Sequence, residues 1–195
     1  AVLHGIPQTW WKPDVVHLHD WHAAPVAPFL KTKYKKDPYW EGVPTILTIH
    51  NLAYQGQYPA SQFPSTGLDE ELLSPEFLEF HGDLNFLKGG ITFADRLNTV
   101  SPRYAREIQT LEYGAGMDGV LRTRRDHLSG ILNGVDYDIW DPRLDPLIPK
   151  TFSADVPEAK GYCKRQLQAK LGLPARDVPL FGVVSRLYWQ KGLDL

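Results

Sequence analysis

Residues 14–25 read DVVHLHDWHAAP, an apolar run that changes abruptly into a polar one. The valines and the leucine favour a buried strand that ends near residue 18. His19, Asp20 and His22 then follow within four positions. Ligands bind at the carboxyl ends of the strands in a parallel α/β sheet, so these titratable side chains indicate a site. The alternative is that they only cap the next helix, with Asp20 as its N-cap.

A second apolar, β-branched run covers residues 45–49 and is also followed by polar residues, His50 and Asn51. Two predicted strands therefore deliver histidines to the same kind of edge, which favours an α/β fold with a site there. Apolar pattern and capping residues predict the remaining elements. Predicted strands cover 96–100, 128–132 and 180–184; predicted helices cover 23–36, 72–80, 85–94, 101–110, 117–124 and 158–171; predicted loops cover 1–13 and 53–70.

The segment from residue 136 to 157 contains four prolines and is predicted to be an extended connector. We place a domain boundary near residues 132–136. Residues 1–132 then form one α/β domain, and residues 133–195 form the connector and the beginning of a second one.

Composition excludes several classes of protein. The 195 residues are 43% hydrophobic and 12% aromatic, which is typical of a chain that forms a core. A net charge of -2 gives no basic footprint for nucleic acid, and no apolar run approaches the ~20 residues of a membrane span. Cys163 is the only cysteine, so no internal disulfide forms, and a reducing compartment is compatible with the chain.

The histidine-rich stretch also allows a metal site. His17, His19, Asp20 and His22 carry the imidazole and carboxylate groups that suit zinc or iron, so a metal-dependent hydrolase is an alternative function. The aspartate stands one position earlier than in the His-x-His-x-Asp-His pattern of metallo-hydrolases. A buried His17 is equally compatible with a structural role.

A second group of candidates follows the predicted strand 180–184. Arg186 offers a planar fork of donors and Lys191 a compact charge, and Gly192 opens a predicted helix. Two cations at a helix N-terminus suit a phosphate, although two surface cations in a loop are the plainer interpretation. Asn133, at the end of the last strand before the connector, either forms a turn or faces a cleft between the two domains.

Seven motifs in this order along nearly the whole chain resemble bacterial glycogen synthase and its plant relative, starch synthase. Together they form a highly specific pattern, although no single one would. They are DVVHLHDWHAAP at 14–25, TIHNLAYQG at 48–56, FLKGG at 86–90, TVSPRYA at 99–105, YGAGMDG at 113–119, LNGVD at 132–136 and SRLYWQKG at 185–192.

The resemblance implies a GT-B glycosyltransferase, in which two Rossmann-like domains enclose the active site. It implies transfer of glucose from ADP-glucose to the non-reducing end of an α-1,4-glucan, with retention and with no cofactor or metal. Asp20 and His50 would contact the donor glucose, with the His50 backbone near the anomeric centre. Asn133 would orient the sugar. Arg186 and Lys191 would bind the diphosphate and stabilise the leaving group.

The resemblance also implies that parts of the family's catalytic machinery are absent from these 195 residues. The family's N-terminal Lys-x-Gly-Gly motif and its C-terminal acidic motif are not in this sequence. We therefore expect a fragment that is inactive alone. Its parent would be cytoplasmic in a bacterium, the favoured case, or plastidic in a plant, with no membrane or nucleic-acid partner. A noncatalytic glucan-binding module, with exposed Trp and Tyr as stacking platforms, is a third hypothesis.

Overall fold

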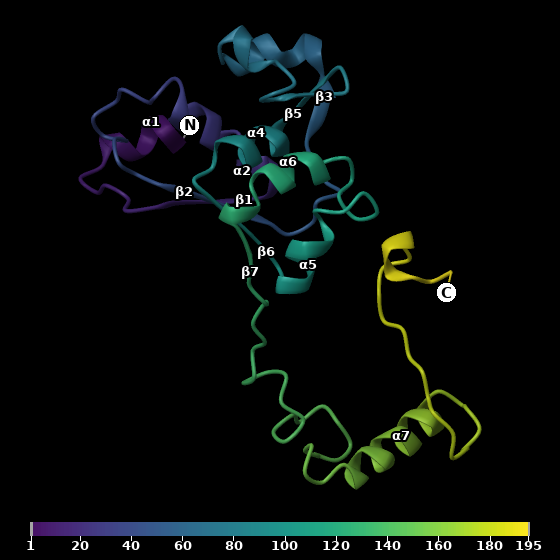
Figure 1. The fold of residues 1–195 in the computed structure, drawn as a ribbon. Helices are drawn as coiled ribbons and strands as arrows, with labels where there is room; N and C mark the ends of the chain where they lie inside the picture. The colour runs from purple at the N-terminus through teal and green to yellow at the C-terminus, as the bar shows by residue number, and fades with distance from the viewer. Residues whose placement is uncertain (1, 195) are drawn as a thin grey trace. The chain divides into compact units, whose positions relative to one another are not determined.

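The computed structural model describes residues 2–194 and divides into two units, Ala1–Asn133 and Gly134–Leu195. The first unit contains all the strands of the described chain (Figure 1). Every helix among residues 2–194 is too short or too polar to span a bilayer.

A parallel sheet of four strands organises the first unit. The strand order is β1-β2-β6-β7, and each neighbouring pair is parallel. The bounds are β1 Val16–His19, β2 Thr45–Ile49, β6 Arg96–Thr99 and β7 Leu128–Gly130. These four strands confirm four of the five that the sequence predicts, with β7 two residues shorter.

Helices cover one face of this sheet. Leu18, Leu47 and Leu97 point to that face and are at most 3% exposed. They pack against the helices α2 Asp20–Ala23, α3 Val26–Lys31, α4 Phe86–Phe93 and α6 Asp118–Thr123. The opposite face carries His17, His19, Thr48 and Asn98, because side chains alternate along each strand.

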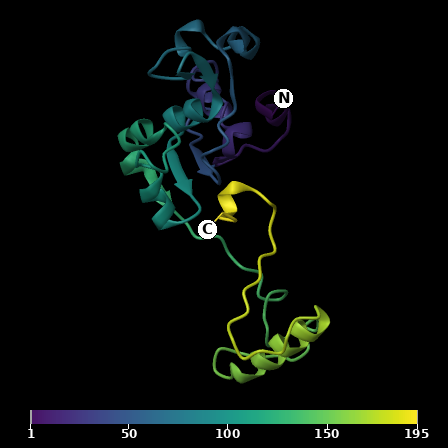
Figure 2. The ribbon, with the colours of Figure 1, turned by 90° about the vertical axis from the view of Figure 1, so that its right-hand side faces the viewer.

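A second, smaller core lies beside the first. An antiparallel sheet has the order β3-β5-β4, from Gln57–Pro59, Asp83–Asn85 and Glu79–Phe80. The 3-10 helices η2 Ala60–Thr66 and η3 Glu70–Leu72 pack there around Phe63 and Leu78. Figures 1 and 2 both show these blue segments at one end of the first unit. The predicted loop 53–70 and the predicted helix 72–80 are therefore wrong in part.

Proline explains another difference. The sequence predicts one helix over 23–36, but the structure has two short helices, α2 and α3, and turns after Lys31. Pro25 lies between the two helices and lacks the N–H that a continuous helix requires, whereas Pro28 lies in the first turn of α3, where proline is tolerated. Residues 1–13, predicted as a loop, include α1 Val2–Gly5 and η1 Ile6–Gln8. The predicted helix start at Ser101 is confirmed, since its hydroxyl accepts from Tyr104 N at 2.9 Å and opens α5 Pro102–Glu107.

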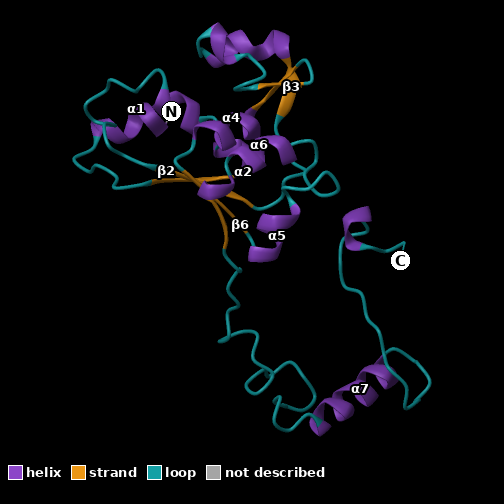
Figure 3. Cartoon of the chain, viewed as in Figure 1, coloured by secondary structure: helices purple, strands orange, loops and turns teal. Residues whose placement is uncertain are grey.

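The second unit contains one long helix. Figure 3 shows the second unit as loop, apart from the helix α7 Glu158–Lys170 and the 3-10 turn η5 Trp189–Lys191. Gly172 has φ +66°, and Leu173 N donates to Gln168 O at 2.8 Å, which ends α7 as predicted. Residues 193–194 form a turn after Gly192, not the predicted helix.

The predicted strand 180–184 is wrong. No strand occurs in the described part of this unit, and Phe181 and Val183 are 90% and 71% exposed. A strand needs partners for its N–H and C=O groups, and apolar pattern alone does not supply them. The expectation of a second parallel sheet is therefore not met among the described residues.

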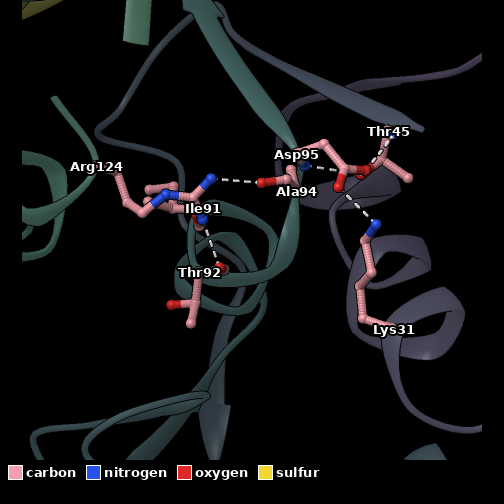
Figure 4. Close-up of polar contacts among 7 residues, drawn as sticks. All are labelled: Lys31, Thr45, Ile91, Thr92, Ala94, Asp95 and Arg124. Carbon is pink, nitrogen blue, oxygen red and sulfur yellow. Dashed lines mark hydrogen bonds and ion pairs between the residues drawn. The ribbon is translucent and has the colours of Figure 1, made fainter. Parts of the chain in front are cut away.

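Polar contacts at the N-terminal end of the sheet fix helix α4 and strand β2 (Figure 4). Asp95 follows α4 and accepts hydrogen bonds from Lys31 Nζ at 2.6 Å and from Thr45 N at 2.7 Å. Arg124 donates to the carbonyl oxygens of Ile91 and Ala94 at 2.9 and 2.6 Å, where the last turn of α4 leaves them unpaired.

Replacement of Asp95 by asparagine is expected to lower stability by roughly 1–3 kcal/mol, the range for hydrogen bonds to a charged group. Burial alone raises the pKa of Asp95, but the bonds from Lys31 and Thr45 outweigh burial and hold the pKa below its ordinary value. The ionised Asp95 therefore stabilises the folded state at neutral pH. This stabilisation is lost as the pH falls from about 4, the ordinary pKa of an aspartate, through the lowered pKa of Asp95. Unfolding curves of the wild type and D95N should therefore converge toward low pH.

The matched control for this experiment is Asp126→Asn. Asp126 is exposed and pairs only loosely with Arg125, at 3.6 Å. Exposed pairs of this kind contribute little, so D126N should unfold like the wild type at every pH. A D95N curve that stays parallel to the wild-type curve down to low pH contradicts the assigned role of the Asp95 charge.

Candidate functional site

The candidate site begins where β1 and β2 end side by side. The register pairs His19 with Thr48, so Asp20, one residue beyond β1, comes close to His50, one residue beyond β2. Asp20 Oδ1 accepts a hydrogen bond from His50 N at 2.8 Å. The carboxylate thus bridges to the neighbouring strand end. The interpretation of Asp20 as a helix N-cap is wrong, because His19 occupies the N-cap position of α2.

Asp20 has an unusual backbone conformation. Its φ is +54°, in the left-handed region that non-glycine residues rarely adopt. Such a conformation costs of order 1 kcal/mol and persists only where surrounding contacts hold it. Here the bond to His50 N is one such contact. The strain lies at the residue that the sequence marks as a site candidate.

Histidines line the edge next to Asp20. His19 Nδ1 lies 2.9 Å from His50 Nε2, and the ring centroids of His17 and His19 are 4.2 Å apart. His17 Nε2 lies 2.7 Å from Thr48 Oγ1. The pKa of His17 is lowered, first by partial burial and then by the nearby His19 and His50, all of which disfavour the charged imidazolium.

The same contacts argue against the metal-dependent hydrolase. Ring nitrogens of His17 and His19 are engaged with Thr48 and His50 rather than converging on one point. The His22 ring stacks on Trp21, with centroids 3.8 Å apart. Among residues 2–194 no group of three or more His, Cys, Asp or Glu side chains is arranged to hold a metal ion. His17, His19, Asp20 and His22 therefore do not form the predicted metal centre.

The loop after β2 is held close to the strand end by contacts that sequence reasoning missed. Leu52 N donates to the Tyr104 hydroxyl at 3.3 Å. Burial, above all, raises the pKa of that tyrosine, and Glu107 and Asp20 add to the effect. Gln55 Oε1 accepts from the buried Asn85 at 2.7 Å, and its Nε2 donates to Ala115 O at 2.9 Å. Leu52, Gln55 and Tyr104 stand in the quoted motifs, but no local pattern shows which motifs contact one another.

Gly56 lets this loop approach the residue after Asp20. It has φ +61°, and a Cβ there would lie 2.3 Å from the Trp21 ring. We expect Gly56→Ala to lower the melting temperature by several degrees, because a left-handed alanine and a ring clash each cost about 1 kcal/mol or more. Gly134→Ala is the control, since no described residue comes within 4 Å of a Cβ placed at Gly134. Equal melting temperatures for the two variants would contradict the close packing of Gly56 on Trp21.

The other candidates lie elsewhere in the chain. Asn133 is exposed and is the last residue of the first unit. Arg186 and Lys191 are exposed residues of the second unit, on either side of the turn at Tyr188. Lys191 N donates to Tyr188 O at 2.9 Å. The structure brings Asp20 and His50 together, and the approach of Asn133, Arg186 and Lys191 to them stays a prediction.

Comparison with known proteins places this arrangement in a family. A family model described as the starch synthase catalytic domain matches residues 1–123. The catalytic domain of starch synthase IV from Arabidopsis thaliana, bound to ADP and acarbose, superimposes with a TM-score of 0.75 at 35% identity. That alignment covers 91% of this chain and 36% of the other.

Curated relatives match along the whole chain. Glycogen synthase of Desulforudis audaxviator is 49% identical over 100% of this chain and 39% of its own length. Glycogen synthase of Thermotoga maritima is 49% identical over 94% of this chain and 38% of its own length. The chain thus spans about two fifths of the length of these relatives.

The parallel sheet, its covering helices and the structural neighbour define the class as an α/β fold of the GT-B glycosyltransferase type. Within that class, the chain belongs to the starch synthase catalytic domain family.

Proposed function

We propose that the protein carrying these residues is a retaining glucosyltransferase that transfers glucose from ADP-glucose to the non-reducing end of an α-1,4-glucan. The observation that carries the proposal is the Asp20–His50 pair at the carboxyl end of a parallel sheet, in a chain of the starch synthase family. The ADP-bound relative supports an ADP-linked donor over a UDP-linked one. We assign residues 1–132 to the acceptor-side domain and 133–195 to the connector and nucleotide-sugar domain.

The first unit would hold the donor sugar. Asp20 Oδ1 accepts a hydrogen bond from the His50 N–H. Its other carboxylate oxygen, Oδ2, would accept a hydrogen bond from a glucose hydroxyl. His50 also contacts the donor glucose, and its backbone, fixed by the bond to Asp20, stands beside the anomeric carbon. Asn133 orients the sugar ring. A fixed geometry of this kind lowers the barrier because the reacting groups need not be ordered during the reaction.

The second unit would hold the diphosphate. Arg186 presents parallel N–H donors to phosphate oxygens, and Lys191 adds a positive charge. Negative charge grows on the ADP leaving group as the glycosidic bond breaks, and cations at that point stabilise the transition state. The side chains supply all of this chemistry, so the proposal includes no cofactor or metal.

Glucose transfer in the complete gene product tests the proposal. Radiolabelled ADP-glucose and UDP-glucose are compared as donors with a glycogen primer, and the expected result is incorporation from ADP-glucose at the higher kcat/KM. Asp20→Ala is expected to abolish most of it, and Asp126→Ala, an exposed carboxylate elsewhere in the unit, is the control. Incorporation from neither donor, or full activity of D20A, overturns the proposal.

A further inference from the structure

His50 is held at two points by consecutive residues of the neighbouring strand end. Asp20 Oδ1 binds its backbone N–H at 2.8 Å. His19 Nδ1 lies 2.9 Å from its ring Nε2, with the two rings inclined by 28°. One contact holds the main chain of His50 and the other holds its imidazole, so both parts of this exposed residue have a partner from the neighbouring strand end.

His19 is itself supported by a chain of side chains that crosses three strands. Its ring lies against the His17 ring, at 4.2 Å between centroids. His17 bonds to Thr48, and Thr48 donates its hydroxyl proton to Asn98 Oδ1. Because that proton is used, His17 Nε2 must carry the hydrogen of its bond to Thr48. The series of contacts from Asn98 in β6 through Thr48 in β2 to His17 in β1 therefore supports the ring of His19.

We propose that His19 is a positioning residue: its Nδ1 fixes the imidazole of His50 in the one orientation that meets the donor sugar. This inference rests on the proposed function, in which His50 contacts the donor glucose. His19 does not touch the sugar and acts only through His50. Loss of the contact would let the His50 ring rotate about its side-chain torsions, and small errors of orientation are costly in a transition state.

Three substitutions separate the hydrogen bond from ring packing. Asparagine at position 19 can place either its amide nitrogen, a donor, or its amide oxygen, an acceptor, near the position of His Nδ1. Phenylalanine keeps a ring without nitrogen, and alanine removes both the ring and the polar atom. In the complete gene product we expect kcat to fall about 10- to 100-fold for His19→Phe and His19→Ala, with the donor KM changed less than about 3-fold. His19→Asn should recover most of the loss.

The control is His127→Phe, the same substitution at the opposite end of the sheet. His127 contacts Arg96 at 3.3 Å, before the start of β7, and its replacement should leave kcat unchanged. Equal kcat values for H19N and H19F would show that His19 acts by packing alone and would overturn the proposal. So would a wild-type kcat for H19F.

A second readout does not depend on turnover. With ¹⁵N-labelled histidine, the ring nitrogens of His50, assigned by the loss of their signals in a His50→Gln variant, should report a single tautomer in the wild type. They should report a mixture of tautomers in H19F. Unchanged His50 signals in H19F overturn the positioning role. An ordered His50 in a protein that transfers no glucose would contradict the proposed function and leave the positioning contact intact.

Discussion

Alanine at position 186 or 191 is expected to reduce the rate of glucose transfer at least ~100-fold, the scale of removing one group that stabilises charge in a transition state. Arg186 and Lys191 are both exposed, so their removal should change stability little. The loss should therefore appear in kcat with ADP-glucose in the complete gene product. Binding of a glucan to the same variants should be unaffected.

Lys170→Ala supplies the control for that experiment. Lys170 is an exposed lysine in the last turn of α7, and its removal subtracts the same charge from the same unit. We expect K170A to retain full activity. A loss below about 10-fold in both R186A and K191A would contradict the diphosphate role. If glucan binding were the only property of the protein, all three variants would be indistinguishable, which is how a noncatalytic module would behave.

The second large effect concerns the 195 residues expressed alone, which we expect to transfer no glucose and to bind ADP too weakly to detect. The segment that leads to Arg186 pairs with no strand among residues 2–194, and Phe181 and Val183 are exposed. Without neighbouring strands in the described part of the chain, the segment carrying the two cations is not ordered by a sheet as a phosphate site requires. The donor's phosphates would then have no ordered partners.

Titration calorimetry with ADP and the radiolabel assay check this expectation, with the complete gene product measured in parallel as the positive control. Efficient glucose transfer by the 195 residues would refute it. A folded first unit should persist in the isolated chain, because the hydrophobic clusters described above lie within residues 1–133. Circular dichroism therefore distinguishes an inactive folded chain from an unfolded one.

Elements with strong local signals could be predicted from the sequence. Thr45–Ile49 forms the predicted strand, and Ser101 caps the predicted helix. Helix α7 ends just before Gly172, which adopts the left-handed backbone conformation that glycine favours. In each case residues within about one turn or one strand length suffice, since β-branching, capping and turn preferences act over a few positions.

Elements that depend on distant partners could not be predicted in this way. Residues 180–184 have the composition of a buried strand yet lie exposed, because no neighbouring strand pairs with them. Residues 57–59 carry no strand pattern yet pair with Asp83–Asn85. Strand formation is a property of a pair, and the partner can lie tens of residues away.

For the site, the sequence by itself determined which chemistry is present: a carboxylate and an imidazole after two strands, and a guanidinium and an ammonium after a third apolar run. Only the tertiary structure decided that the Asp20 carboxylate accepts a hydrogen bond from the His50 N–H and that the His19 and His50 rings lie within hydrogen-bond distance. The reason is register. His19 and Thr48 stand about thirty positions apart in the sequence, and their alignment sets which side chains of the two strands lie within hydrogen-bond distance. A shift of one residue in this alignment would turn every side chain of the shifted strand to the other face of the sheet.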